Sequence, residues 1–434
     1  MQMNLNLPMR MPKDVYEYGT RTSGEVHGVV LTKPHVVELI LDLAGYTSDR
    51  NLADETLLEP SCGHGAFLVP TVTRLLEAAR RSGRGASTLG DAVLAFDIEG
   101  EHVTRTRTAL FNVLRDYRVG QADAERLVAS WVREDDFLLA PIERMFAFVI
   151  GNPPYIRIEQ LAAGLQSEYR RRYCSLYDRA DLYVAFIERA LATLSPNGVL
   201  SFICADRWVS NKYGAPLREI VSARHKVRCY VDLHKASPFE SAVVAYPSIF
   251  VLSPGKSENV PVVTLETASA QECRAVTRVL AGKADAFPSG VSVSNYTCWF
   301  EGDDPWVLSS PVHLETLRAL EAKFASIEST ARIGIGVATG NDELYIVRRN
   351  ADIEPDRFVP LVMRDDIEKG KIRDAGRFVI NTFDDTGHVV NLDQYPRLRN
   401  YPTASIRGCD RGCDRADGPT SGVENAPGHC LGAD

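Results

Sequence analysis

A short run, Asn152-Pro153-Pro154-Tyr155, joins an amide, two prolines and an aromatic ring directly after an apolar stretch of strand length, residues 146–151. The prolines end a strand, because they cannot donate to its hydrogen-bond ladder and they fix φ. The Asn152 side-chain oxygen and the Pro153 carbonyl could accept two hydrogen bonds from one amino group, while Tyr155 offers a face for stacking. These residue types suit a planar ring with an exocyclic amino group, such as adenine. A plain turn between strand and loop is the alternative.

A second stretch has the composition of a ligand-binding turn. Glu59 ends a short predicted strand, residues 57–59, whose other two residues are apolar. Pro60, Ser61, Gly63 and Gly65 follow before a helix that we expect from about residue 66. The two glycines let the backbone approach a ligand closely and adopt conformations that other residues avoid. The pattern is shorter than the full dinucleotide-binding fingerprint, so a tight strand–helix turn without a ligand is the alternative.

Two more acidic positions lie near predicted strand ends. Asp97 ends the predicted strand 92–99, where an acid typically accepts hydrogen bonds from ribose hydroxyls. Asp136 is followed by Phe137, so the pair could bind an adenine amino group and stack on its ring. A helix N-cap at Asp97 and a solvated acidic loop at Asp136 are the alternatives. The order of Glu59, Asp97 and Asp136 is what a nucleoside cofactor would need.

The elements that must position these residues alternate between strand and helix from residue 57 to residue 252. This alternation predicts a doubly wound, mostly parallel α/β sheet with helices on both faces. Such sheets bind ligands at the carboxyl ends of their strands. Upstream, Thr32 is expected to be the N-cap of a helix with Pro34 in its first turn.

A basic run, Arg170-Arg171-Arg172, lies between two tyrosines in what we expect to be a polar loop, residues 156–179. Arginines between tyrosines suit contacts with nucleic-acid phosphates and stacking nearby, so we expect these three to contact a nucleic-acid backbone. A solvated helix face is the alternative.

Composition bounds the class of protein. The 434 residues are 45% hydrophobic and 24% charged, with no apolar run of membrane-spanning length and no apolar core of signal-peptide length near the start. The nine cysteines are scattered, which predicts a cytoplasmic protein without a disulfide framework. A net charge of −8 argues against a generally sticky nucleic-acid binder, although a local basic groove is compatible with it.

Changes in composition predict the domain organisation. We expect a leader (1–24), a large domain (25–265), a linker with helices (266–330), a second region of short strands (331–404) and a disordered or aberrant tail (405–434). The tail carries Cys409, Cys413, His429 and Cys430, whose spacing matches no standard zinc site, so no metal is expected.

Residues 58–68, with Asn152-Pro153-Pro154-Tyr155 downstream, closely resemble the DNA adenine-N6 methyltransferases of the gamma motif order, found in type II restriction–modification systems. The resemblance implies a class I fold that depends on S-adenosylmethionine. It also implies double-stranded DNA as substrate, so the backbone contacted by Arg170, Arg171 and Arg172 would be that of DNA. It allows a separately encoded restriction endonuclease as partner. It implies that the segment holding Thr32 closes over the methionine end of the cofactor, and that residues 59–67 form the cofactor loop. Asp97 would bind the ribose, and Asp136 with Phe137 the adenine.

The same resemblance makes Asn152 to Tyr155 the catalytic motif and gives Phe239 the place of an aromatic that packs against a flipped base. Residues 336–341 would start the target recognition domain, which makes 331–404 a partial target recognition region and 25–265 the catalytic domain. His64 stands between the glycines of the cofactor loop and is assigned no role. Three other functions stay open: an inactive DNA- or cofactor-binding remnant, a protein glutamine-N5 methyltransferase, which uses the same four-residue motif, and an RNA adenine methyltransferase.

Overall fold

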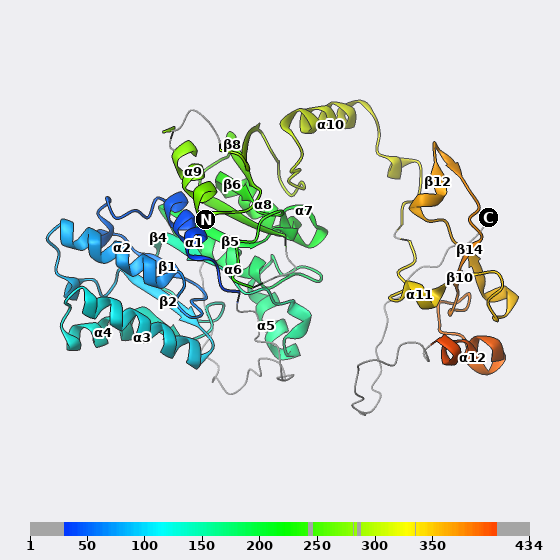
Figure 1. Ribbon diagram of the computed structural model, residues 1–434, viewed down its shortest axis with the longest axis horizontal. Coiled ribbons are helices and arrows are strands. Elements are labelled where there is room, and N and C mark those ends of the chain that lie inside the picture. Colours follow the sequence, from blue (N-terminus) through cyan, green and yellow to red (C-terminus); the bar gives the residue numbers. More distant parts are fainter. Residues whose placement is uncertain (1–29, 242–245, 281, 284–287, 335, 406–434) are drawn as a thin grey trace. The chain divides into compact units, whose positions relative to one another are not determined.

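The computed structural model describes residues 30–241, 246–280, 282–283, 288–334 and 336–405 (Figure 1). The chain divides into two compact units, Met1–Phe324 and Ala325–Asp434, and each is described by itself. The predicted leader and the residues of the tail from 406 onward, with its cysteines, lie outside the described residues.

A nine-stranded sheet forms the centre of the first unit, in the order β3-β2-β1-β4-β5-β7-β6-β8-β9. Strands β7 and β9 run antiparallel to their neighbours, and every other neighbouring pair is parallel. This confirms the predicted doubly wound, mostly parallel sheet. The strands are β1 (Leu57–Glu59), β2 (Val93–Asp97), β3 (Val132–Glu134), β4 (Phe146–Gly151), β5 (Leu194–Ala205), β6 (His225–Asp232), β7 (Pro247–Pro254), β8 (Asn259–Leu265) and β9 (Val291–Thr297).

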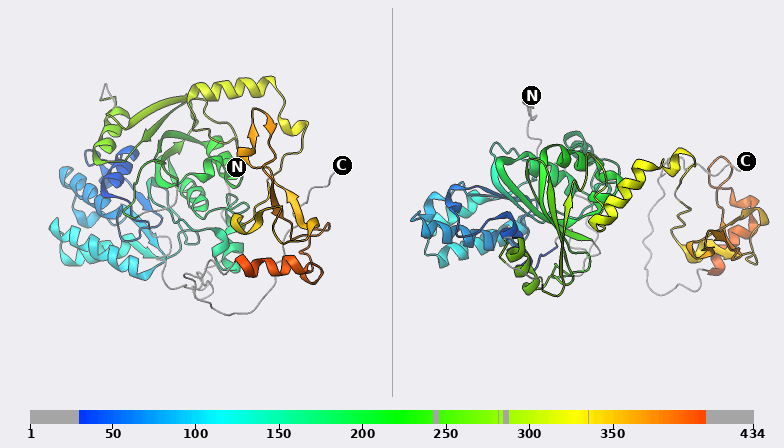
Figure 2. Two further views of the ribbon diagram at one scale, coloured as in Figure 1. Left: turned by 45° about the vertical axis from the view of Figure 1, so that its right-hand side comes forward. Right: turned by 90° about the horizontal axis from the view of Figure 1, so that it is seen from above.

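Helices cover both faces of this sheet (Figure 2), because successive strand residues point to opposite sides. Leu57 joins a core with apolar residues of α1 to α4 and α9, whereas Leu58 joins a core with apolar residues of α5 to α8 and α10. The helices are α1 (Pro34–Ala44), α2 (Leu68–Arg81), α3 (Gly100–Asp116), α4 (Gln121–Trp131), α5 (Ala163–Arg172), α6 (Tyr183–Ala192), α7 (Arg207–Ser210), α8 (Ala215–Arg224), α9 (Ala270–Leu280) and α10 (Pro311–Lys323).

The strand order reverses beside β1, and this fixes where a ligand can bind. The chain passes from β1 to β2 and β3 on one side, and returns to place β4 on the other side of β1. Because β1 and β4 are parallel, Glu59 and Asn152 both lie at their carboxyl ends. In open α/β sheets this reversal opens the crevice that binds ligands.

Four local expectations differ from the structure. The segment 266–330, expected to be a linker with helices, does contain α9 and α10, but it also supplies β9 to the sheet, and the first unit extends to Phe324. Within the expected loop 156–179, residues Ala163–Arg172 form α5. The sequence Pro196-Asn197-Gly198 has the composition of a turn, but these residues lie inside β5 where its register with β4 shifts. Thr32 is not the N-cap of α1: Lys33 holds that place, without a side-chain cap.

The second unit, described up to residue 405, is small. Its three-stranded antiparallel sheet has the order β10-β14-β11, and a separate hairpin pairs β12 with β13. A small core forms around Val347, Ile380 and Leu398. The elements are α11 (Asp342–Tyr345), β10 (Ile346–Arg348), β11 (Phe358–Pro360), β12 (Ile367–Glu368), β13 (Lys371–Ile372), β14 (Arg377–Ile380) and α12 (Pro396–Ser405).

Two structural findings bear on the class of protein. None of the helices in the described part of the chain has the length and apolar character to cross a membrane. Across the same residues, no group of three or more histidine, cysteine, aspartate or glutamate side chains is placed to hold a metal ion.

Candidate active site

The side chain of Asn152, directly after β4, is held in one orientation. Its amide nitrogen donates to the carbonyl of Val30 at 3.0 Å and to Thr32 Oγ1 at 3.4 Å. Its backbone carbonyl accepts from the hydroxyl of Ser61 at 3.0 Å. Because a backbone carbonyl can only accept, the amide nitrogen must face Val30 and the amide oxygen must face away. That oxygen is buried and accepts no hydrogen bond from the described residues, so it is available to a ligand.

Two aromatic rings come from the segments that hold this amide. Tyr155 and Phe239 meet edge to face, with ring centroids 6.1 Å apart and an interplanar angle of 83°. Phe239 is brought there by its backbone, which forms an isolated antiparallel bridge with Thr32, flanked by a hydrogen bond from Lys33 N to Pro238 O at 2.9 Å. Thus three predicted site residues that are far apart in the sequence, Thr32, Tyr155 and Phe239, are brought together.

The phenol of Tyr155 is the second buried group without a partner. Its hydroxyl oxygen finds no hydrogen-bond partner among the described residues. Burial raises the pKa of Tyr155 well above its ordinary value, so the ring is neutral at physiological pH. Of the two prolines between Asn152 and Tyr155, Pro153 is buried and Pro154 is half-buried.

Glu59, at the end of β1, is the third buried group. The residue is 1% exposed, and its Oε2 atom has no partner among the described residues. Burial, and secondarily the negative charge of Asp97, raises the pKa of Glu59 well above its ordinary value. A buried carboxylate without a partner is costly, so this position favours a ligand that donates a hydrogen bond or carries positive charge.

The turn after Glu59 is closed by contacts to β2 and α3. The amide of Gly63 donates to Asp97 Oδ2 at 2.8 Å, and the carbonyl of Gly63 accepts from the hydroxyl of Thr106 at 2.8 Å. Pro60 and Ser61 precede this turn, with Pro60 buried. A helix N-cap role does not by itself account for the contacts of Asp97, because its carboxylate holds both the glycine turn and the start of α3.

His102 is a site residue that the sequence analysis missed. Its Nδ1 lies 3.1 Å from Asp97 Oδ1, which also accepts from the amide of Glu99 at 3.0 Å. The ring of His64 packs edge-on against His102 at 4.8 Å between centroids. A histidine five residues after the acid, inside a predicted helix, was the only signal in the sequence.

Asp136 and Phe137 lie next to this region but face inward. Asp135 N donates to the carbonyl of Asp97 at 3.0 Å, which sets this loop beside β2. The Asp136 carboxylate accepts from Leu138 N at 2.8 Å and from the Tyr169 hydroxyl at 2.5 Å. Phe137 is 1% exposed and packs in the core between Phe96 and Phe186, so its ring face is covered by protein. The cofactor role of this pair stays a prediction.

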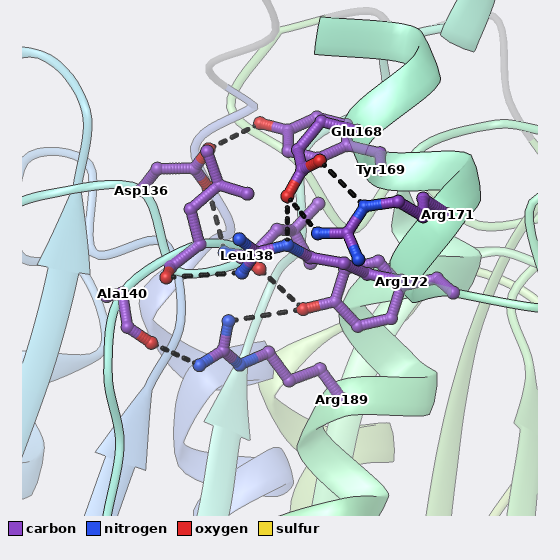
Figure 3. Close-up of polar contacts among 10 residues, drawn as sticks. Asp136, Leu138, Ala140, Glu168, Tyr169, Arg171, Arg172 and Arg189 are labelled. Carbon is purple, nitrogen blue, oxygen red and sulfur yellow. Dashed lines mark hydrogen bonds and ion pairs between the residues drawn. The ribbon is translucent and has the colours of Figure 1, made fainter. Parts of the chain in front are cut away.

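The three arginines of the basic run all have partners within the protein. Figure 3 shows Arg171 and Arg172 with Glu168. Arg170 donates to the carbonyl of Asp178 at 2.6 Å. Arg171 and Arg172 both pair with Glu168, at 2.8 and 2.6 Å, and their side chains are 56% and 16% exposed. Any phosphate that binds Arg171 would therefore compete with Glu168. A DNA contact by these arginines stays a prediction.

The two glycines of the cofactor turn differ in their surroundings, which gives a testable contrast. Gly63 (φ +50°) has no atom within 4 Å of where a Cβ would lie, whereas a Cβ on Gly65 (φ +85°) would lie 3.2 Å from Thr106 Oγ1. We expect Gly63→Ala to lower the free energy of unfolding by about 1–2 kcal/mol through backbone strain, and Gly65→Ala to lower it further.

The comparison variant for this pair is Gly83→Ala, at the other end of α2, where φ is +70° and the space is also open. Denaturant unfolding measures the strain, and calorimetric titration with S-adenosylmethionine measures the affinity. We expect Gly63→Ala to weaken cofactor binding and Gly83→Ala to leave it unchanged. Equal cofactor affinities of these two variants would show that Gly63 does not face the cofactor.

A cavity adjoins this constellation. It has a volume of about 820 Å³ and is lined by Thr32, by His64 to Ala66 and by residues of α1 and α2. Thr32 and Gly65, both predicted to bind a cofactor, therefore face one hollow. Glu59 Oε2 and Asn152 Oδ1, which have no hydrogen-bond partner among the described residues, are two further buried polar positions at the carboxyl ends of β1 and β4.

Comparison with known proteins shows which family the chain resembles. The model of the Eco57I restriction-modification methylase family matches residues 95–239. The type II methyltransferase M.BstVI of Geobacillus stearothermophilus is 41% identical over 88% of this chain and 71% of its own length. The type II methyltransferase M.PaeR7I of Pseudomonas aeruginosa is 42% identical over 87% of this chain and 66% of its own length.

A solved structure resembles this chain in fold alone. The type IIG restriction endonuclease BpuSI superposes with a TM-score of 0.50 at 16% identity, over 90% of this chain and 48% of that one. The chain spans 66% to 71% of the length of the two methyltransferases above. With about 40% identity over most of its residues, the chain belongs to the type II methyltransferases of restriction-modification systems.

Proposed function

We propose that this protein transfers a methyl group from S-adenosylmethionine to the N6 atom of adenine at a specific site in double-stranded DNA. The observation that carries the proposal is the Asn152 side-chain oxygen, which is buried and is oriented by Val30 and Thr32. Tyr155 follows it in the motif and packs against Phe239, whose backbone pairs with Thr32. An acceptor next to aromatic rings suits an extrahelical base with an amino group.

The proposed chemistry depends mainly on positioning. The Asn152 oxygen and the Pro153 carbonyl accept the two hydrogens of the adenine amino group, and Tyr155 and Phe239 hold the ring. These hydrogen bonds draw the nitrogen toward tetrahedral geometry and direct its lone pair for in-line attack. The buried Tyr155 remains neutral and acts as no base. The amino proton leaves after the transfer, so catalysis here is chiefly orientation and electrostatics.

The cofactor fits the donor and acceptor groups of the chain. Glu59 offers a buried carboxylate oxygen without a partner, and Gly63 leaves open space at the turn. Asp97 holds the turn and would bind the ribose, while Thr32 lies at the cavity next to Asn152. When bound, S-adenosylmethionine supplies the electrophilic methyl group. DNA as substrate, a separately encoded nuclease as partner and a cytoplasmic location are part of this proposal, and the family membership supports them.

The direct test is single-molecule sequencing of DNA from a methylation-free bacterial host that expresses this chain. We expect N6-methyladenine at one defined motif, and no modified adenine in a parallel culture that expresses the Asn152→Ala variant. This result would establish the reaction and the recognition sequence together.

Three other outcomes would contradict the proposal. Methylated cytosine at a motif would mean that the amino group held by Asn152 belongs to another base. Unmodified host DNA, together with a purified protein that binds S-adenosylmethionine, would indicate an inactive remnant with an intact cofactor site. A methylated glutamine in a host protein, with unmodified DNA, would favour the protein methyltransferase.

A further inference from the structure

A second cavity lies on the first unit, outside the site described above. Its volume is about 540 Å³, and its lining includes Arg207, Asn211, His234 and Tyr246 together with residues 305–308. These residues come from three separate parts of the chain: α7 and the residues around it, the connection between β6 and β7, and the segment after β9. Nothing in the proposed chemistry uses them.

The cavity lies at the same edge of the sheet as the catalytic motif. Asp206 follows the carboxyl end of β5, His234 follows that of β6, and Tyr246 precedes the antiparallel β7. Strand β5 is the direct neighbour of β4, and β7 and β6 come next. With about 5 Å between neighbouring strands, the lining residues begin one strand away from Asn152. A DNA strand that delivers a base to Asn152 can extend along this edge.

The walls of the cavity are fixed by buried hydrogen bonds. Asp206 Oδ2 accepts from the Tyr230 hydroxyl at 2.7 Å and lies 2.6 Å from His234 Nε2. The buried Arg218 donates to the carbonyls of Trp208 and Asn211 at 2.6 and 2.8 Å, which fixes the turn after α7. A site with walls held in this way needs little reordering when it binds a ligand.

The electrostatics favour an anion. The guanidinium of Arg207 makes no hydrogen bond or ion pair with any described residue, although Arg207 is only half-exposed. The hydrogen bond to Asp206, outweighing burial, raises the pKa of His234, so the protonated form of His234 is favoured beside the Asp206 carboxylate. Exposed Lys212 and Lys235 directly follow the lining residues Asn211 and His234 in the chain. Arg207 is thus a cation poised for a phosphate.

One lining side chain offers a stacking surface. Tyr246 is 57% exposed, which is unusual for a large aromatic, and its ring centroid lies 5.2 Å from that of His234. His234 is itself held by Asp206 and lies 3.6 Å from Asp232 through Nδ1. The imidazole therefore supports the tyrosine from one side, and the exposed ring can stack on a nucleobase.

We propose that this cavity is a nucleotide subsite, which binds a phosphate and the neighbouring base of the DNA strand that carries the target adenine. Arg207 holds the phosphate, Tyr246 stacks on the base, and the Asp206–His234 pair positions Tyr246. The inference rests on the proposed function, because it assumes that DNA lies along this edge of the sheet.

The test measures DNA binding and uses a short duplex with the motif found by sequencing. Fluorescence anisotropy measures the affinity for this duplex over a range of salt concentrations. The proteins compared are wild type, Arg207→Ala, Arg207→Lys and Arg224→Ala. We expect Arg207→Ala to bind about tenfold or more weakly, and its plot of log affinity against log salt to be shallower by about one unit. Arg207→Lys should keep the slope. Arg224, exposed at the opposite edge where α8 ends and β6 begins, serves as the matched control and should behave as wild type.

Single neutral methylphosphonates, placed one at a time near the target adenine, identify the phosphate. We expect one position at which the substitution weakens wild type but not Arg207→Ala, which is the non-additivity of a direct contact. For the base, Tyr246→Ala should weaken binding about fivefold or more, while Tyr246→Phe should bind as wild type.

Two results would overturn the subsite: an Arg207→Ala protein with wild-type affinity and salt slope, or equal sensitivity of both proteins to every methylphosphonate. Affinity for S-adenosylmethionine is measured in parallel and should be unchanged, which shows that the variants are folded. Failure of the proposed function itself would appear separately, as a wild-type protein that methylates no DNA. If Arg207→Ala does not fold, Arg207→Gln replaces it in both measurements.

Discussion

Replacement of Asn152 by alanine is expected to slow adenine methylation by about 100- to 1,000-fold, the usual effect of deleting one preorganised hydrogen-bonding group at a reacting centre. The amide oxygen of Asn152 is buried and oriented, so no water can take its place at low cost. Binding of S-adenosylmethionine should remain close to wild type, because Glu59 and the glycine turn do not depend on this side chain. Single-turnover methylation of a duplex and calorimetric cofactor titration measure the two effects separately.

The Asn152→Asp variant separates the two tasks of this side chain. Aspartate keeps an oxygen for the adenine amino group, but it cannot donate to the carbonyl of Val30, which the native amide contacts at 3.0 Å. We therefore expect its activity to lie between alanine and wild type. Asn197→Ala removes an exposed amide from the shifted part of β5 and is the matched control. An alanine variant at position 152 that methylates at the wild-type rate would exclude the proposed role.

Much of the catalytic edge could be predicted from the sequence, because the relevant signals are local. A strand that ends in an acid or in an Asn-Pro-Pro run places that residue at the carboxyl end, and the alternation of strands and helices makes the strands parallel. Glu59, Asp97 and Asn152 lie at these ends in the structure. The direction of the parallel strands alone therefore tells which edge of the sheet carries the site.

Other parts of the site depend on long-range contacts that carry no local signal. The bridge between Thr32 and Phe239 joins residues that are far apart in the sequence, and the same segment orients Asn152 through Val30. Helix α5 was expected to be a loop because only Leu165 and Tyr169 in it are buried, so it has almost no apolar periodicity. Strand β9 lies in a polar segment, and its pairing with β8 stabilises it.

Conversion of Glu59 to glutamine is expected to stabilise the cofactor-free protein at neutral and alkaline pH and to weaken S-adenosylmethionine binding. Burial, with Asp97 nearby, holds the pKa of Glu59 well above its value in the unfolded chain. The folded protein therefore binds more protons than the unfolded one. Ionisation of Glu59 lowers the free energy of unfolding as pH rises from the unfolded pKa, about 4.3, to the folded pKa. Each unit of the shift corresponds to about 1.4 kcal/mol.

The measurement is denaturant unfolding of wild type and Glu59→Gln, without cofactor, across a pH series. The stability difference in favour of the variant should be absent near the unfolded pKa, should grow as pH rises, and should become constant above the folded pKa. Glu143→Gln, which changes an exposed carboxylate just before β4, should show no such trend. A difference that does not vary with pH would mean that Glu59 ionises as easily in the folded protein as in the unfolded chain.

The cofactor should reverse the preference, because its sulfonium and ammonium groups are positively charged and Glu59 offers a buried oxygen without a partner among the described residues. We expect Glu59→Gln to bind S-adenosylmethionine about tenfold or more weakly at neutral pH, since a charge-assisted hydrogen bond becomes a neutral one. If Glu59 interacts with the sulfonium, sinefungin, which keeps a positive charge in that place, should lose the same affinity. S-adenosylhomocysteine, whose thioether is uncharged, should then lose less affinity. Equal losses for all three ligands would place Glu59 against the amino acid or nucleoside part, and no loss for any of them would remove it from the cofactor site.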